Sequence, residues 1–218
     1  MASLSVVIRT LLKTYKPRPW WERVPPLELL VAVILSQRTN WRNARRALER
    51  LKERFGAVDR LAEASVEEIE DAIRPAGLYR SRASVLREVA CAFGGSRIED
   101  LLSLPYEEAK RRLMSVRGIG PKTADVFLML ARGEPVLPVD THIRRVLVRL
   151  GFASGREGYE ELRASLESEV PPEDRLRAHL ALVAFGREVC RPVSPRCDIC
   201  PFSAWCPSSI KPKRKTRQ

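Results

Sequence analysis

The stretch SVRGIGPKTADVFLML, residues 115–130, decides the fold of this chain. Gly118 and Gly120 flank an isoleucine, Lys122 follows, and the sequence then turns almost wholly apolar. With the helical pattern of residues 104–116 before it, this stretch predicts a helix, a tight turn and a second, buried helix. The glycines let another backbone approach closely, and the N-terminus of the second helix suits a phosphate oxygen. A purely structural helical hairpin is the alternative on this stretch alone.

The lysine in this turn is uncommon for the chain, which has 31 arginines and only 8 lysines. An arginine would hold a phosphate as well or better, but it cannot form a Schiff base. We therefore predict that Lys122 is a nucleophile. Asp140 follows eighteen residues later in PVLPVDTHIRRVL (135–147), directly before a helical pattern. It is either only an N-cap or also a rigidly held carboxylate that faces Lys122, and the two roles are compatible.

The rest of the chain also reads with helical period, and no two-residue alternation typical of strands is present. We therefore predict an all-α fold of about ten helices joined by short connections. Residues 24–37, apolar on every side, should form a fully buried helix, and Ser65 and Glu68 form a capping-box pattern. The stretches expected to be helical are 24–37, 65–73, 82–93, 104–116, 120–131 and roughly 140–150, 157–168 and 173–188.

The charge of the chain favours a polyanionic partner. Its 218 residues carry a net charge of +12 and give a pI near 10.0. Nucleic acid is the simplest such partner, because each phosphate contact releases counterions, and a generally basic protein is the alternative. No run of eighteen apolar residues is present, and the N-terminus lacks the basic start of a signal peptide. We therefore expect an intracellular protein without a membrane partner.

Four of the five cysteines lie in CRPVSPRCDICPFSAWC, residues 190–206, with the spacing C-x6-C-x2-C-x5-C. Disulfides are not expected in an intracellular chain, so four thiolates indicate zinc or an iron–sulfur cluster. Zinc sites usually have two short Cys-x2-Cys pairs and this stretch has one, so the spacing favours a [4Fe–4S] cluster. Cys91 is expected to be a buried core thiol, and His142 and His179 are expected to be structural. The predicted ligands are Cys190, Cys197, Cys200 and Cys206.

The hairpin that ends in Lys122, the aspartate at 140 and the cysteine tail together resemble the endonuclease III family of DNA glycosylases. The resemblance runs from about residue 25 to Cys206 and specifies the [4Fe–4S] cluster. LSQRTN (35–40) is similar to the family's loop with a characteristic glutamine, and GLYRSRA (77–83) to its second DNA-facing loop. The chain departs from the family pattern at Asn40, where many members carry aspartate, and this bears on base preference.

The resemblance implies two helical domains with the DNA cleft between them. Residues 23–134 would form a six-helix barrel that carries the helix–hairpin–helix, and residues 1–22 with 135–218 would form the helical domain that carries the cluster loop. Two further departures lie in the hairpin: Arg117 replaces the usual proline, and Pro121 stands where a basic residue is common. Neither removes a catalytic group.

The function implied by the resemblance is that of a bifunctional DNA glycosylase and abasic-site lyase. It would remove damaged, mainly oxidised, pyrimidines from double-stranded DNA and cut at abasic sites. Lys122 would attack C1′ as a neutral amine, Asp140 would assist, and the Schiff base would permit nicking by β-elimination. The predicted DNA contacts are Gln37 and Leu78, which would fill the vacated stack, Gly118 and Gly120 in the hairpin, and Arg191 and Arg196 in the cluster loop.

Two other functions are compatible with the sequence. One is a mismatch-specific thymine or uracil glycosylase on the same fold, and the other is a non-catalytic DNA-binding protein with a structural metal. We expect a monomer, located in the cytoplasm at the nucleoid of a prokaryote, or in the nucleus of a eukaryote. The sequence does not specify the lesion, the opposite base, or a monovalent cation in the hairpin.

Overall fold

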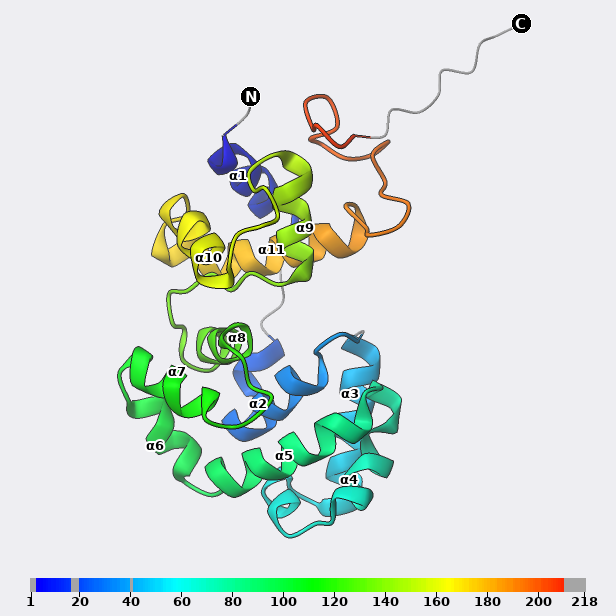
Figure 1. Ribbon diagram of the computed structural model, residues 1–218, viewed down its shortest axis with the longest axis vertical. Helices are drawn as coiled ribbons and strands as arrows, with labels where there is room; N and C mark the ends of the chain where they lie inside the picture. Colours follow the sequence, from blue (N-terminus) through cyan, green and yellow to red (C-terminus); the bar gives the residue numbers. More distant parts are fainter. Residues whose placement is uncertain (1–2, 17–19, 40, 210–218) are drawn as a thin grey trace, which may run out of the picture. The chain divides into compact units, whose positions relative to one another are not determined.

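The computed structural model describes residues 3–16, 20–39 and 41–209. These residues form helices and loops and no strand, so the predicted all-α class is confirmed. No helix in this part of the chain is long and apolar enough to cross a membrane. The chain divides into two compact units (Figure 1), a middle unit of Pro19–Glu134 and a terminal unit of Met1–Arg18 with Pro135–Gln218.

The middle unit is built around helix α2, Pro26–Leu35, which the other helices of this unit surround in Figure 1. Leu27 and the seven residues 29–35 are buried, as the uniformly apolar sequence predicts. Pro25 is the N-cap and Pro26 the first residue of the helix, because proline fits a first helical position where no N–H partner exists. The other elements are η1 Trp20–Arg23, α3 Trp41–Phe55, η2 Val58–Ala62, α4 Val66–Ile73, η3 Arg74–Ala76, α5 Tyr79–Phe93, α6 Arg97–Ser103, α7 Tyr106–Met114 and α8 Pro121–Arg132.

The terminal unit has a core of its own, to which every α-helix of this unit contributes. Val7, Leu147 and Leu182 lie at its centre. The loop after the last helix packs on the same core through Phe202, whose ring centroid lies 5.4 Å from that of Phe185. The elements are α1 Leu4–Thr14, α9 Thr141–Leu150, α10 Tyr159–Ser168, η4 Pro172–Asp174 and α11 Arg175–Glu188. Residues 189–209 follow as an irregular loop.

The predicted helices agree with the observed ones to within a few residues. The capping box at the start of α4 is confirmed, because the Ser65 hydroxyl accepts from the Glu68 N–H and the Glu68 carboxylate accepts from the Ser65 N–H. The helix expected at 82–93 begins earlier, at Tyr79, because Leu78 takes a left-handed conformation and acts as its N-cap. The described residues form eleven α-helices, close to the expected number.

The prediction that Cys91 is buried is wrong. Cys91 is exposed on α5, and all five cysteines are free thiols. The buried face of α5 contains Ala83, Leu86, Ala90 and Phe93. Each residue advances about 100° around a helix, so the residue after Ala90 lies outside this face. The apolar residues next to Cys91 in the sequence therefore do not show that Cys91 itself lies on the buried face.

Candidate functional site

The turn between α7 and α8 is held by Gly118 and Ile119. Gly118 has a φ of +95°, and an added Cβ would lie 2.6 Å from Cγ2 of Val85. Ile119 is buried and anchors the turn, and its N–H donates to the Val116 carbonyl at 3.1 Å. Gly120 is different, because its φ is −89° and an added Cβ would meet no described atom within 4 Å. The fold therefore requires glycine at 118 but not at 120.

Helix α8 starts directly after this turn, with Pro121 in its first turn and Lys122 next to it. Its N-cap is Gly120, which has no side chain to accept from the first N–H groups. The positive end of the helix dipole therefore has no side-chain cap. Lys122 is half-buried, whereas the seven residues 123–129 are all buried. Lys122 thus lies at the N-terminus of α8, which is the accessible and electropositive end of a helix that is otherwise largely buried.

A buried ion pair joins the two helices of the hairpin. The Lys110 Nζ on α7 lies 3.1 Å and 3.2 Å from the two carboxylate oxygens of Asp125 on α8. The hydroxyl of Tyr106 donates to the same carboxylate at 2.7 Å, and the Asp125 side chain is fully buried. Because Asp125 lies one turn after Lys122, this group fixes the helix that carries the lysine against α7.

Two further predicted DNA contacts also lie in the middle unit. The side-chain amide nitrogen of Gln37 donates to the Thr123 hydroxyl at 3.0 Å, which places Gln37 against the first turn of α8. Leu78 has 54% of its surface exposed and a φ of +49°, so an apolar side chain projects from a left-handed turn. Asn40, at the end of the glutamine loop, lies outside the described residues.

Asp140 is the N-cap of α9 in the terminal unit. Its Oδ1 accepts a hydrogen bond from the Ile143 N–H at 2.8 Å. The extended segment before it is held by His179, whose Nδ1 lies 2.8 Å from the Pro138 carbonyl oxygen. His179 is buried, in agreement with the structural role predicted for it. The cap bond therefore holds the carboxylate of Asp140, and His179 holds the backbone two residues before it.

Arg145 connects the helix of Asp140 with the cysteine loop. Its guanidinium donates to the carbonyl oxygens of Cys190 at 2.9 Å and Gly186 at 2.7 Å. Burial lowers the pKa of Arg145 from its usual value, while attraction to Cys190 and Asp140 opposes that shift. Arg145 thus lies within the electrostatic reach of both the aspartate and the first cysteine.

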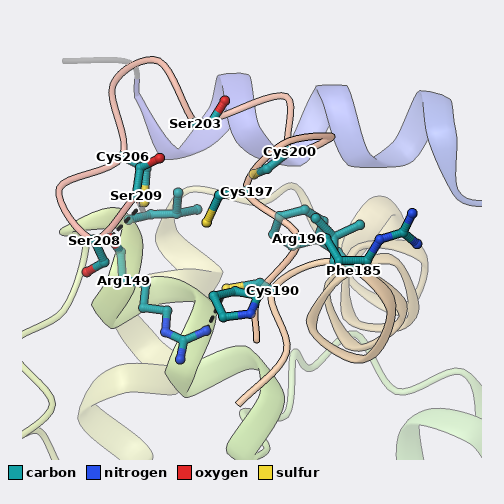
Figure 2. Close-up of a pocket in the computed structure, with 13 residues that line it drawn as sticks. Arg149, Phe185, Cys190, Arg196, Cys197, Cys200, Ser203, Cys206, Ser208 and Ser209 are labelled. Carbon is teal, nitrogen blue, oxygen red and sulfur yellow. Dashed lines mark hydrogen bonds between the residues drawn. The ribbon is translucent and has the colours of Figure 1, made fainter. Parts of the chain in front are cut away.

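The four clustered cysteines line one pocket of the terminal unit (Figure 2). Phe185 and Leu150 form part of its apolar wall. Burial raises the pKa of the Cys200 and Cys206 thiols, and repulsion from the neighbouring cysteines adds to the rise. Within the described residues, no group of three or more histidine, cysteine, aspartate or glutamate side chains is placed to hold a single metal ion.

Arg149 ties the cysteine loop to α9. Its guanidinium contacts the Cys190 sulfur at 3.6 Å and donates to the carbonyl oxygens of Arg191 at 2.5 Å and Pro192 at 3.0 Å. Its own carbonyl accepts from the Cys206 thiol at 3.2 Å. The side chains of Arg191 and Arg196, the two predicted phosphate contacts of this loop, belong to exposed residues. The loop therefore carries exposed charge on a backbone that a third arginine holds in place.

The structure brings two groups of predicted residues together. In the middle unit, Gln37 contacts the residue that follows Lys122. In the terminal unit, the four cysteines share a pocket, and Arg145 connects it with Asp140. Lys122 and Asp140 belong to different units, and their pairing remains a prediction.

Comparison with known proteins decides the family. Residues 31–172 match the family described as HhH-GPD superfamily base excision DNA repair protein. Endonuclease III of Sulfolobus acidocaldarius is 36% identical over 182 residues, which cover 81% of this chain and 79% of that protein. The chain belongs to the endonuclease III family. It is a base excision DNA repair protein, and the resemblance seen in the sequence is confirmed.

Solved structures of endonuclease III agree with this assignment. A non-covalent endonuclease III–DNA complex has a TM-score of 0.82 at 28% identity and covers 96% of this chain and 97% of that one. A trapped endonuclease III–DNA covalent intermediate, an estranged-adenine complex, has a TM-score of 0.79 at 30% identity, with 96% and 98% covered. This member of the endonuclease III family therefore has the family fold along nearly its whole length.

Three side chains of this endonuclease III family member escaped prediction from the sequence. Arg145 and Arg149 lie four residues apart on α9 among apolar residues, a spacing that places both on one helix face and could have drawn attention to them. Thr123 gave no signal, because a single threonine in an apolar helix is common. Its contact with Gln37 joins segments 86 residues apart.

Proposed function

We propose that this base excision repair protein is a bifunctional DNA glycosylase and abasic-site lyase that acts on oxidised pyrimidines in double-stranded DNA. The observation that carries the proposal is Lys122 at the accessible N-terminus of α8, directly after the glycine turn. A relative in the same family forms a covalent intermediate with DNA that has been trapped. In a chain that otherwise favours arginine, a lysine here supports covalent chemistry.

Lys122 is assigned the nucleophile. Its neutral amine attacks C1′ of the damaged nucleotide, the new N–C bond forms, and the glycosidic bond breaks with its electron pair leaving on the base. The amine loses a proton, the C1′–O4′ bond of the sugar ring breaks with its electron pair leaving on O4′, which takes a proton, and a ring-opened iminium forms. The iminium acidifies the C2′ proton, so removal of that proton expels the 3′-phosphate and nicks the strand. Water then hydrolyses the Schiff base and restores the amine. Each step needs only the lysine, water and a group that accepts and returns protons.

Asp140 is assigned the carboxylate that assists this attack. Its cap bond to the Ile143 N–H uses Oδ1 and holds the group in one orientation. Oδ2 is the atom that we assign to the proton of the attacking amine and to the positive charge that develops on the sugar. An aspartate locked by its own helix loses little entropy when it acts, which favours this assignment over a mobile side chain.

We assign the binding of a DNA phosphate to the turn between α7 and α8, and we call this contact the phosphate grip. The empty space where a Cβ of Gly120 would lie leaves room for a phosphate at the N-terminus of α8. Gln37 and Leu78 are assigned to the space that the flipped nucleotide leaves, since glycosylases act on a base that has been turned out of the stack. The exposed, apolar Leu78 suits contact with base faces.

The four cysteines of the terminal unit are assigned to a [4Fe–4S] cluster. Four cysteine thiols line one pocket, and four thiolates are the ligand set that a [4Fe–4S] cluster would take. Their spacing, with a single Cys-x2-Cys pair, favours the cluster over zinc. When bound, the cluster supplies a covalent cross-link of residues 190–206. Arg149 already orders the same loop by bonds to its backbone, and Arg191 and Arg196 are assigned to DNA phosphates.

In this proposal the protein acts on DNA as a monomer. It does so at the nucleoid in a prokaryote or in the nucleus in a eukaryote. Its +12 net charge supports a partner that is itself densely negative. Association with DNA should therefore be fast and strongly dependent on salt.

A panel of defined duplexes tests the proposal. Each duplex carries an oxidised pyrimidine, a uracil, a thymine mismatch or an abasic site, and base release and strand nicking are measured separately. We expect release and nicking with the oxidised pyrimidine and nicking at the abasic site. Release limited to thymine or uracil would instead identify a mismatch glycosylase. Binding to the duplexes without release of any base would identify a non-catalytic protein.

The cluster is tested on the purified protein. We expect the protein to be brown and to contain about four irons per chain.

A further inference from the structure

One buried arginine joins the loop that carries Gln37 to the loop that carries Leu78, the two side chains assigned to the DNA stack. Arg82 on α5 is only 4% exposed. Its Nη1 donates to the carbonyl oxygens of Ala76 at 2.9 Å and Gly77 at 2.7 Å, directly before Leu78. Its Nη2 donates to the carbonyl oxygen of Gln37. One guanidinium therefore holds the backbones of two loops that lie about forty residues apart.

Both loops adopt backbone conformations that ordinary residues avoid. Leu78 has a φ of +49°, and Arg38, which follows Gln37, has a φ of +52°. Such left-handed residues persist only where the surrounding structure determines them, because each costs of order 1 to 3 kcal/mol. The bonds from Arg82 end at the residues next to these two positions. The arginine is thus placed to hold both strained turns at once.

Stability alone does not explain an arginine here. No carboxylate of the described residues forms an ion pair with Arg82, and burial lowers the pKa of its guanidinium from the usual value. A buried charge that is satisfied by carbonyl oxygens is costly, and an apolar side chain is often tolerated better in such a place. The rigid fork of arginine is, however, the side chain that can bond to two loops in fixed directions.

We propose that Arg82 is a positioning residue that sets Gln37 and Leu78 in one relative geometry, so that the two side chains enter the DNA stack as a unit opposite the flipped nucleotide. This inference rests on the proposed function, which assigns both loops to DNA. Arg82 itself touches no DNA in this scheme. It acts by fixing the carbonyl groups on which the two turns are built.

A binding experiment without catalysis tests the inference independently of Lys122. The duplex carries a tetrahydrofuran abasic analogue with 2-aminopurine opposite, whose fluorescence rises when it leaves the stack. Wild-type protein at saturation should raise the fluorescence, and Arg82→Met should raise it at least about threefold less. Arg87→Met, the matched loss of an exposed arginine on the same helix, should behave as wild type. Full fluorescence with folded Arg82→Met, or none with wild type, would overturn the inference.

Two further variants separate positioning from folding. Arg82→Lys keeps the charge and part of the hydrogen bonding, so it should fold even if Arg82→Met does not, and should give an intermediate signal. Leu78→Ala should lower the signal, and Arg82→Lys should lower it less in that background than in the wild-type protein, because residues that act through one another are not additive. The inference would be overturned if the losses caused by Leu78→Ala and Arg82→Lys were additive. It would also be overturned if Arg82→Met did not fold and Arg82→Lys gave the wild-type signal. Failure of wild type to cut abasic DNA would refute the proposed function and leave this result valid.

Discussion

The two glycines of the hairpin should respond in different ways to the same substitution. Gly118→Ala should destabilise the protein, and Gly120→Ala should leave its stability close to that of wild type while it weakens DNA binding. The difference follows from the backbone, since Gly118 has a φ of +95° and faces Val85, whereas Gly120 has a φ of −89° and open space.

The magnitudes can be worked from these two environments. A left-handed conformation costs an alanine about 1 to 2 kcal/mol, and forcing a methyl group to 2.6 Å from Val85 costs about 1 to 3 kcal/mol more. Valine is stiff about χ1, so it cannot easily move aside. Gly118→Ala should thus lose about 2 to 5 kcal/mol of a typical stability of 5 to 15 kcal/mol. Gly120→Ala should change stability by less than about 1 kcal/mol, because the lower entropy of the unfolded chain, about 0.4 to 1 kcal/mol, offsets the weaker N-cap that alanine provides.

The effect of Gly120→Ala on DNA affinity should be larger than its effect on stability. A methyl group there would keep a phosphate from the N–H groups of α8, and hydrogen bonds to a charged group contribute about 1.5 to 3 kcal/mol. Affinity should fall roughly 10- to 150-fold. Urea unfolding measures the first quantity, and fluorescence anisotropy with a tetrahydrofuran-containing duplex at fixed salt measures the second. Wild-type affinity in Gly120→Ala would refute the phosphate grip, and wild-type stability in Gly118→Ala would refute the backbone argument.

The remaining predictions concern the terminal unit. Asp140→Asn should fold as wild type, because asparagine caps helices about as well as aspartate, yet base excision should fall ~10² to 10⁴-fold, with nicking of a preformed abasic site partly kept. Near-normal base excision by Asp140→Asn would show that Asp140 is only a helix N-cap. Replacing Arg191 and Arg196 together by glutamine should lower the slope of log affinity against log salt by roughly 1 to 2, and an unchanged slope would remove this loop from the interface. Cys200→Ser should lose iron while the exposed Cys91→Ser keeps it, and equal iron contents would contradict the four-cysteine assignment.

The helices could be predicted from the sequence because each carries local signals. The capping box at Ser65 and the uniformly apolar stretch that became α2 depend on neighbours within a few residues. Cys91 was misplaced because a single residue at the border of a helix face is decided by packing, not by its own type. The left-handed turn at Leu78, which moved the start of α5, likewise depends on contacts from outside that helix.

The candidate site was predictable where residue chemistry is specific and invisible where it depends on distant contacts. Lys122 stood out because the chain is poor in lysine, and the four cysteines stood out by spacing. The three carbonyls that Arg82 holds come from two loops, and the short stretch GLYRSRA alone does not show that its second arginine points inward. The helix period of α5 would have shown it, since Arg82 shares a face with Leu86 and Val89.

Borohydride trapping with peptide mapping tests the central claim most directly. Wild-type protein is mixed with a duplex that contains an abasic site, the Schiff base is reduced, and mass spectrometry identifies the modified residue. The account predicts one covalent complex, with the sugar on the peptide that contains Lys122, and its loss in Lys122→Ala. The cross-link on any of the other seven lysines, or undiminished trapping by Lys122→Ala, would contradict it.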